Sequence, residues 1–366
     1  MANPAHHNVL QAPGQPGHTD SQTPDDNPLP PALAVARLRF TALPERPLQL
    51  PAHAGALLRG VFGAALRQGA CSTGLPRCGE CPLLRSCAYP ALFETPPQPT
   101  QFAQRFSQMP NPYVIEPPPG LARVRPGERL VFHMVLVGEA TQQQLPLVVG
   151  AWQRALAAGL GQARVPARLV AVESVDAQGL AQPAFDLAAR RTLAALPLLD
   201  LGAIARAGTQ MAGGVLLQFD SPLRLQHESQ PLRPPQLRPR AFVSHLLRRI
   251  NLMLDLHLGI RPAPFDVHAL LALADQLADD RSQLHWQDLR RYSASQGREL
   301  PQGGVMGRWA WQGPVVPLLP WLLLGQWLHV GKAATAGLGG YSLSAKVVDA
   351  DASVAMHPSR STRQEA

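Results

Sequence analysis

The sequence has few aromatic residues, few charged residues and almost no lysine. Aromatic residues make up 5% and charged residues 16% of the 366 positions, and Lys332 and Lys346 are the only lysines. The most apolar stretch, residues 314–324, is short and contains three prolines. The N-terminal residues do not show the charged segment followed by an apolar segment that a secretory signal has. We therefore expect neither a secretory signal nor a membrane-spanning helix, and we expect a cytoplasmic protein.

The positive charge is carried almost wholly by arginine. The formal net charge is +8 and the isoelectric point is near 10.0. A guanidinium group pairs with two phosphate oxygens at once, so this composition suits a nucleic-acid partner. A GC-rich genome also favours arginine, and many basic proteins bind no nucleic acid. Charge alone therefore leaves both interpretations open.

Composition divides the chain into two domains between two unstructured ends. Polar, proline-rich sequence without hydrophobic periodicity predicts a disordered leader over 1–31 and a disordered tail over 350–366. Hydrophobic residues make up 46% of the chain, enough for two packed cores. We expect an N-terminal domain over 32–175, a connector over 176–210 and a C-terminal domain over 211–349.

Hydrophobic periodicity predicts a similar order of elements in both domains. The first has predicted strands at 34–42, 129–138 and 164–173 and predicted helices around 57–66 and at 145–158. The second has predicted strands at 214–219, 303–312 and 340–348 and predicted helices at 240–256, 266–278 and 315–328. Residues 146–152 and 317–327 are each followed by a Gly-Leu-Gly sequence, which suggests duplication. The fold class is therefore α+β, with two tandem ferredoxin-like domains.

Four cysteines lie in one insertion, which we place at about 69–120. They are Cys71, Cys78, Cys81 and Cys87, spaced C-x6-C-x2-C-x5-C. In a reducing compartment such clustering favours metal binding over disulfides. A structural zinc ion is the main prediction, because two cysteines in a tight turn hold one ion and the flanking pair completes a tetrahedron. A [4Fe–4S] cluster also takes four cysteines, and unliganded thiols are the third possibility.

A glycine-rich run joins the last predicted helix to the last predicted strand. It contains Lys332 and the glycines Gly331, Gly337, Gly339 and Gly340. Glycines allow backbone N–H groups to turn toward a phosphate at close range. The Gly-Lys pair precedes the other glycines, so the run is not the phosphate loop of nucleotide hydrolases. An ordinary turn is the alternative.

Three features together resemble the CRISPR-associated precursor-RNA-processing endoribonucleases of the RAMP superfamily. They are the glycine-rich loop before the last strand, the Leu-Arg-Gly-Val-Phe-Gly helix segment at 58–63, and the cysteine cluster between them. Segments 112–118, 286–293 and 325–341 also resemble stretches of that family, so the likeness spans about 33–348. The resemblance implies two ferredoxin-like domains related to the RNA-recognition motif. It implies CRISPR repeat RNA and other CRISPR-associated effector subunits as partners, and no membrane.

The chemistry implied by the resemblance needs no metal ion. The ribose 2′-hydroxyl attacks the neighbouring phosphate and leaves a 2′,3′-cyclic phosphate and a 5′-hydroxyl. This step requires a base, an acid and a cation near the crowded phosphate. Some relatives bind guide RNA without cutting it. A non-catalytic guide-RNA-binding subunit of an effector complex is therefore the alternative.

The resemblance also suggests residues for these roles. Histidine suits either proton transfer near neutral pH, and His53 and His329 lie beside family-like segments. His53 at a helix start and His329 in an apolar helix end are equally explained as residues without chemistry. Lys332 would stabilise the transition-state charge. Tyr292 would orient the 2′-hydroxyl or stack on a base, although ordinary half-burial also explains a tyrosine there.

The predicted RNA-binding residues are Arg59, Arg248 and Arg249 together with the four loop glycines. Arg248 and Arg249 follow a basic stretch that suits contact with a phosphate backbone. Solvation of a helix face is the more ordinary explanation for any one of these arginines.

Overall fold

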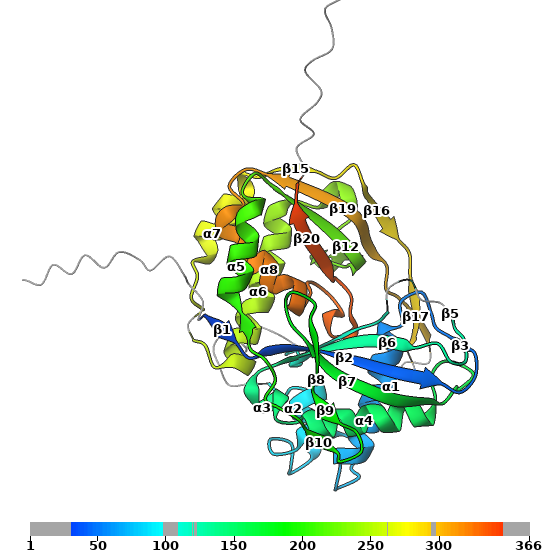
Figure 1. The fold of residues 1–366 in the computed structure, drawn as a ribbon. Helices are drawn as coiled ribbons and strands as arrows, with labels where there is room; N and C mark the ends of the chain where they lie inside the picture. Colours follow the sequence, from blue (N-terminus) through cyan, green and yellow to red (C-terminus); the bar gives the residue numbers. More distant parts are fainter. Residues whose placement is uncertain are drawn as a thin grey trace, which may run out of the picture.

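The computed structural model describes residues 31–97, 109–118, 120, 123–261, 263–293 and 298–346. Apart from Pro31, the predicted leader and tail lie outside these residues. The described chain forms two units, each an antiparallel sheet with helices packed on it (Figure 1).

The first unit has the ferredoxin-like order of elements. Along the chain these are β2 (Val35–Pro44), α1 (Gly55–Ala70), β4 (Tyr113–Glu116), β6 (Leu130–Val137), α4 (Leu145–Ala158) and β7 (Ala167–Val175). In space the strands lie in the order β4-β6-β2-β7-β8, so β2, the first long strand of the chain, is central. α1 and α4 cover one face, where Phe40, Phe132 and Trp152 stack into the core. These large apolar residues fall at the inward positions of their strands and helix.

The second unit repeats this arrangement. Its elements are β12 (Val215–Leu223), α6 (Pro239–Met253), β16 (Leu284–Gln287), β19 (Gly304–Gln312), α8 (Leu319–Leu328) and β20 (Tyr341–Ala345). The strands lie in the order β20-β12-β19-β16, which matches the first sheet strand for strand. α4 and α8, which carry the echoed sequences, occupy equivalent places. The predicted tandem ferredoxin-like fold is confirmed.

The structure has further helices, short strands and single helical turns in addition to these two sets of elements. The helices are α2 (Ala88–Phe93), α3 (Glu139–Gln142), α5 (Leu201–Gly208) and α7 (Val267–Asp275). The short strands are β1 (Ala32–Leu33), β3 (Leu48–Gln49), β5 (Arg123–Val124), β8 (Ala181–Pro183), β9 (Phe185–Asp186), β10 (Arg191–Thr192), β11 (Leu199–Asp200), β13 (Gln226–His227), β14 (Gln230–Pro231), β15 (Ala278–Asp280), β17 (Arg290–Ser293) and β18 (Arg298–Pro301). Single helical turns add η1 (Cys78–Glu80), η3 (Thr209–Met211), η4 (Pro234–Gln236), η5 (Leu254–Leu258), η6 (Val316–Leu318) and η7 (Ala334–Ala336).

Two predictions about the order of elements were wrong. Periodicity did not predict β4 and β16, the second strand of each sheet, and so gave β-α-β-α-β for the first domain. β4 has four residues between prolines, and β16 alternates apolar and polar residues over only four positions, so both are too short for a clear periodic signal. The predicted insertion at 69–120 therefore overlaps a strand of the sheet. The connector at 176–210 contains β8 to β11 and α5.

Candidate functional site

An open cleft lies where α1 and residues 109–111 of the first unit face α6, the glycine-rich loop and the segment after β12 of the second. Its volume is about 450 Å³. The basic residues that line it are Arg59, Arg224, Arg248, Arg249 and Lys332. No aspartate or glutamate is among the described residues on its wall. A concave surface with cations alone concentrates field lines and attracts polyanions.

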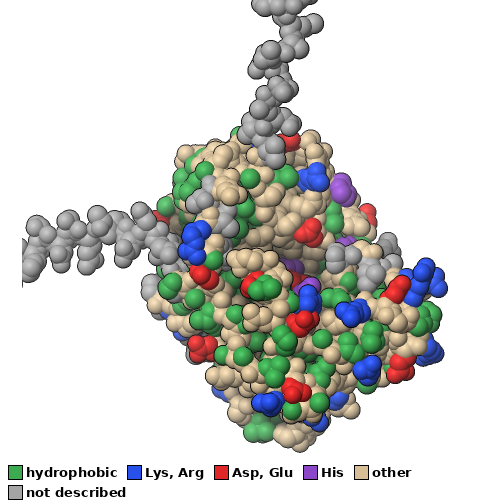
Figure 2. All heavy atoms as spheres, viewed as in Figure 1, with side chains coloured by type: hydrophobic (Ala, Val, Ile, Leu, Met, Phe, Trp, Pro, Cys, Tyr) green, Lys and Arg blue, Asp and Glu red, His purple; other side chains and the backbone are tan. Residues whose placement is uncertain are grey.

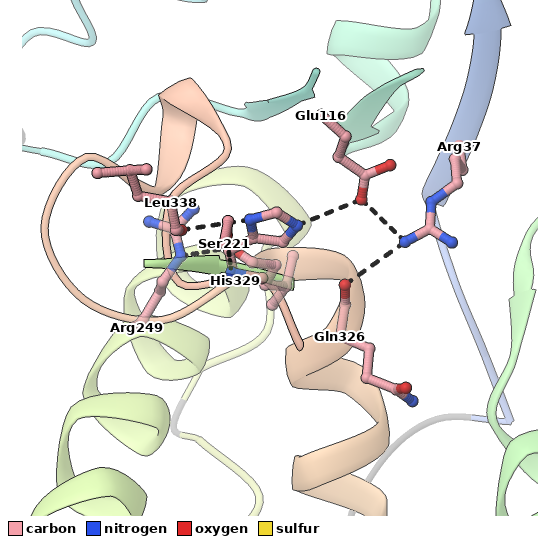
Figure 3. Close-up of polar contacts among 9 residues, drawn as sticks. Arg37, Glu116, Ser221, Arg249, Gln326, His329 and Leu338 are labelled. Atoms are coloured by element: carbon pink, nitrogen blue, oxygen red, sulfur yellow. Dashed lines mark hydrogen bonds and ion pairs between the residues drawn. The ribbon is translucent and has the colours of Figure 1, made fainter. Parts of the chain in front are cut away.

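Arg249 is the most deeply set of these cations. Its Nε donates a hydrogen bond of 2.6 Å to the carbonyl of Leu328 at the end of α8, and Figure 3 shows the side chain below the loop. Its Nη2 is buried and has no hydrogen-bond partner among the described residues. Burial lowers the pKa of Arg249 to about 10. A buried cationic donor without a partner is costly unless a ligand supplies an acceptor.

The glycine-rich loop docks the second unit onto the first. A Cβ on Gly55, at the start of α1, would lie 1.8 Å from the carbonyl oxygen of Ala336. Gly337 has φ +80, and a Cβ there would lie 2.5 Å from the carbonyl oxygen of Ile115 in β4. Both contacts are closer than any other residue permits. The glycines therefore allow the loop to lie directly against α1 and β4.

The prediction that the loop amides face a phosphate is wrong for three of the four glycines. Gly337 N–H bonds to Ala334 O, Gly339 N–H to Pro222 O at 3.0 Å, and Gly340 N–H to Ser221 Oγ at 2.8 Å. A phosphate would have to break these bonds. Gly331 does line the cleft. The other glycines act in packing, because no side chain fits where they lie.

A polar network crosses between the units beside the loop (Figure 3). Arg37 of β2 forms a 2.9 Å ion pair with Glu116 of β4 and lies 4.4 Å above the Trp327 ring of α8. Glu116 in turn accepts a 3.3 Å hydrogen bond from Nε2 of His329. Burial alone would raise the pKa of Glu116, but Arg37 and His329 outweigh it and lower the pKa to about 2. The carboxylate is therefore charged and holds both partners in place.

His329 belongs to this network and not to the open cleft. Its exposed fraction is 5%, and its Nδ1 lies 3.3 Å from the Leu338 carbonyl on the far side of the loop. The ring packs against Gly340, where a Cβ would come within 2.6 Å of it. Because both ring nitrogens face acceptors and the ring is enclosed, a substrate has no route to it here. The structure corrects the catalytic prediction for His329 to a role in holding the loop.

His53 occupies a more accessible place next to the same loop. It is half-buried two residues before Gly55, and its side chain is hydrogen-bonded to Gln287 at the end of β16. Burial lowers the pKa of His53 below its ordinary value, against the opposing effect of the Gln287 bond. The imidazole is therefore held unprotonated at neutral pH, the form that accepts a proton. Its role as catalyst stays a prediction.

The other predicted site residues divide between the cleft and the surroundings. Lys332 is exposed on the wall of the cleft, and its backbone N–H donates to Arg224 O at 3.0 Å. Arg248 is exposed there, and the Arg59 guanidinium lies 4.3 Å above the Phe93 ring. The backbone of Tyr292 pairs with Glu299 in the β17–β18 hairpin, but its side chain lies outside the described part of the structure.

Two residues on the cleft wall and the partners of His329 were not predicted from the sequence. Arg224 and His245 line the cleft. His245 lies 2.8 Å from Ala241 O and 3.1 Å from Gln226 O, and burial lowers its pKa. Its place one turn before Arg249 in a basic helix was a usable signal. Arg37 and Glu116 gave none, because they meet only after their strands pair in the sheet.

The four cysteines gather at the far end of α1. All four thiols are free within the described chain and line one small cavity. Among the described residues, no three cysteine, histidine or acidic side chains are close enough together to hold a single ion.

One face of the molecule is mixed in charge. On the face drawn in Figure 2, acidic and basic side chains are interspersed, and a hollow lies between the two halves. The net charge is therefore not spread as one field over that face. In the described part of the chain no helix has the length and apolar character to cross a membrane.

Comparison with known families matches both units separately. A family model described as CRISPR-associated endoribonuclease Cas6 matches residues 217–341, and a model described as an N-terminal domain matches residues 32–195. No curated protein matches the chain in sequence.

Solved structures share the fold at low sequence identity. Chains titled as a partial Cas6-RT-Cas1–Cas2 complex and a Cas6-RT-Cas1–Cas2 complex match 91% of this chain at 16% identity and a TM-score of 0.52. This chain spans 50% and 31% of their respective lengths. A Thermus thermophilus Cas6 matches 86% of this chain and 99% of its own length at 14% identity, with a TM-score of 0.46. The unit that carries the loop thus matches the Cas6 family of CRISPR-associated endoribonucleases over residues 217–341.

Proposed function

We propose that this chain binds CRISPR repeat RNA in the basic cleft and cuts it without a metal ion. The observation that carries the proposal is the cleft itself, where five cations line a wall without a carboxylate among the described residues. The proposed occupant is a single-stranded segment of the repeat, whose phosphates meet Arg248, Arg249 and Lys332.

The proposed chemistry uses His53 as the base. An unprotonated imidazole takes the proton of the ribose 2′-hydroxyl, whose oxygen attacks the adjacent phosphate. The bond from phosphorus to the 5′-oxygen breaks, that oxygen takes a proton from water, and the imidazolium of His53 returns its proton to water. The products carry a 2′,3′-cyclic phosphate and a 5′-hydroxyl. Lys332 at the start of the loop is the proposed cation for the crowded phosphate. Gln287 is proposed to hold the imidazole in position from the second unit.

The test is cleavage of end-labelled repeat RNA in EDTA by the full chain. We expect one cut with a cyclic-phosphate end, and His53→Ala lowers the rate by about 100-fold or more while binding stays intact. His227→Ala is the matched control, because His227 is exposed on the β13–β14 hairpin. Cleavage by His53→Ala at the wild-type rate would remove His53 from the mechanism.

A second outcome would change the proposed activity itself. Tight binding of repeat RNA by the wild-type chain, with no cut in EDTA or in Mg²⁺, would favour the non-catalytic guide-RNA-binding subunit. Association with other CRISPR-associated proteins and a cytoplasmic location also stay predictions. Co-purification from cells that carry the neighbouring CRISPR genes tests the association.

A further inference from the structure

An arginine and a tryptophan stack on each other at the edge of the second sheet. The guanidinium carbon of Arg233 lies 3.7 Å from the centroid of the Trp286 ring. Trp286 belongs to β16, which pairs with β19 (Figure 1), and Arg233 directly precedes η4, the turn that leads into α6. In the described part of the chain no carboxylate pairs with this guanidinium. Its charge is therefore available to a ligand.

The indole ring under the arginine is fixed by two further contacts. Its Nε1–H donates a 2.7 Å hydrogen bond to the Asp288 carboxylate. A Cβ on Gly303, just before β19, would lie 3.1 Å from Cζ2 and Nε1 of the ring, so the backbone there packs closely against that edge. Trp286 is half-buried and contacts the core of the second unit. The stack is therefore ordered before any ligand arrives, which lowers the entropy lost on binding.

The stack lies beside the wall of the basic cleft. Arg224 lines the cleft, and its Nη1 donates a 3.0 Å hydrogen bond to the carbonyl of Gly303. The β13–β14 hairpin pairs Gln226 with Pro231. The same register, continued toward the base of the hairpin, sets Arg224 opposite Arg233. Positive charge therefore continues from the cleft to the stack along one hairpin.

A stacked guanidinium offers different parts to a base and to a phosphate. A nucleobase stacks on its flat face, and its N–H groups at the edge donate to phosphate oxygens. Arg233 is exposed, so the face that turns away from the indole meets solvent. A phosphate alone would need only the charge, and the Asp288 carboxylate beside the ring would repel it. The arrangement therefore suits a nucleotide with an unpaired base better than a lone anion.

We propose that Arg233 and Trp286 form a stacking platform for one unpaired base of the bound RNA, next to the basic cleft. This inference rests on the proposed function, because the same RNA strand has to pass through the cleft. A strand whose phosphates contact Lys332 and Arg224 continues onto the platform. Contacts to the phosphates carry no information about the sequence. The platform, which accepts only an unpaired base, therefore sets where along the repeat the single strand is held.

Binding of repeat RNA by Arg233→Ala and Arg233→Lys at fixed salt tests the platform. Lysine keeps the charge but has no flat face, so both variants are expected to lose about tenfold in affinity. Arg191→Ala is the matched control, because Arg191 is exposed in β10 of the first unit, and its affinity stays that of the wild type. Wild-type affinity in Arg233→Lys would overturn the platform, because charge alone would then account for the contact.

Repeat RNA with one base removed at a time identifies the base that stacks. Removal at one unpaired position is expected to weaken binding to the wild-type chain about tenfold. The same removal weakens binding to Arg233→Ala no further, because base and platform form a single interaction. Binding of intact RNA without any position coupled to Arg233 would overturn the platform alone. Failure of the wild-type chain to bind intact repeat RNA would overturn the proposed function as well.

Discussion

At the scale of single residues, burial separates cations that look alike in the sequence. Arg248 and Arg249 are neighbours on α6, yet Arg248 is exposed and the Arg249 guanidinium is buried with Nη2 lacking a partner among the described residues. An exposed arginine is already solvated and gains little from a phosphate. The buried one has lost its water, so a phosphate restores a strong interaction.

We therefore predict opposite effects of Arg249→Gln on RNA binding and on stability. Affinity for repeat RNA falls by about 10- to 100-fold, because a charge-assisted hydrogen bond is lost. The free energy of unfolding stays the same or rises, because an uncompensated buried charge is removed. Binding titrations at fixed salt and urea unfolding measure the two quantities.

The neighbouring arginine is the control for that pair of measurements. Arg248→Gln is expected to weaken binding only several-fold, as exposed ion pairs do. Equal losses of affinity in the two variants would show that the buried position confers no advantage.

At the scale of elements, α1 links the cleft to the cysteine segment, residues 71–87. Its first turn abuts the glycine-rich loop through Gly55, its middle carries Arg59, and its last turn carries Arg67 against the cysteine segment. Gly60 and Gly63 lie on different sides of this helix. Gly60 is exposed, and a Cβ there would meet no atom within 4 Å, whereas a Cβ on Gly63 would lie 2.2 Å from the Phe93 ring.

This difference predicts opposite results for one chemical change. Gly60→Ala raises the free energy of unfolding by up to about 1 kcal/mol, because alanine favours the helix and meets nothing. Gly63→Ala lowers it by about 1–3 kcal/mol, because the ring must move. Thermal or urea unfolding of both variants measures the effect. A stabilising Gly63→Ala would show that Phe93 is not fixed under Arg59.

At the scale of the whole molecule, the two units are joined by buried polar groups as well as by the loop. His257, at the end of the α6 region, lies 2.8 Å from Pro110 O of the first unit through its Nε2. Burial outweighs that bond and lowers the pKa of His257 to about 4. Glu116 joins the same units with a pKa lowered to about 2. Both groups make the interface sensitive to acid.

The pKa of His257 predicts where stability changes with pH. The folded state binds this proton only near pH 4, while the unfolded state binds it near 6.5. Its contribution to stability is therefore full above about pH 6.5 and is lost as the pH falls toward 4, an effect of about 3 kcal/mol. The contribution of the charged Glu116 carboxylate to stability is lost at lower pH, as the pH falls below the ordinary pKa of a carboxyl group.

Urea unfolding at pH 7 and pH 4.5 checks this dependence. His257→Gln keeps a donor toward Pro110 O but does not titrate, so its stability falls less between these pH values than that of the wild type. His227→Gln, on an exposed hairpin, leaves the dependence unchanged. An identical pH dependence in wild type and His257→Gln would contradict the prediction.

The features that depend on local pattern could be predicted from the chain alone. Periodicity located α1, α4, α6 and α8 and the long strands, because each buries one face at a regular spacing. Spacing singled out the cysteines, and the loop glycines were recognised from composition, because both signals are local in the chain. Arginine content indicated a polyanion, though not where it binds.

Which of these residues meet, and which face water, depends on the tertiary structure. Arg37, Glu116 and His329 come from three distant segments, and only strand pairing and loop docking place them in one network. The same docking enclosed His329 and left His53 accessible beside Gln287. It also used the amides of Gly339 and Gly340 in hydrogen bonds to β12. Burial and the pairing of polar groups arise from contacts between residues far apart in the chain, and a local pattern does not contain them.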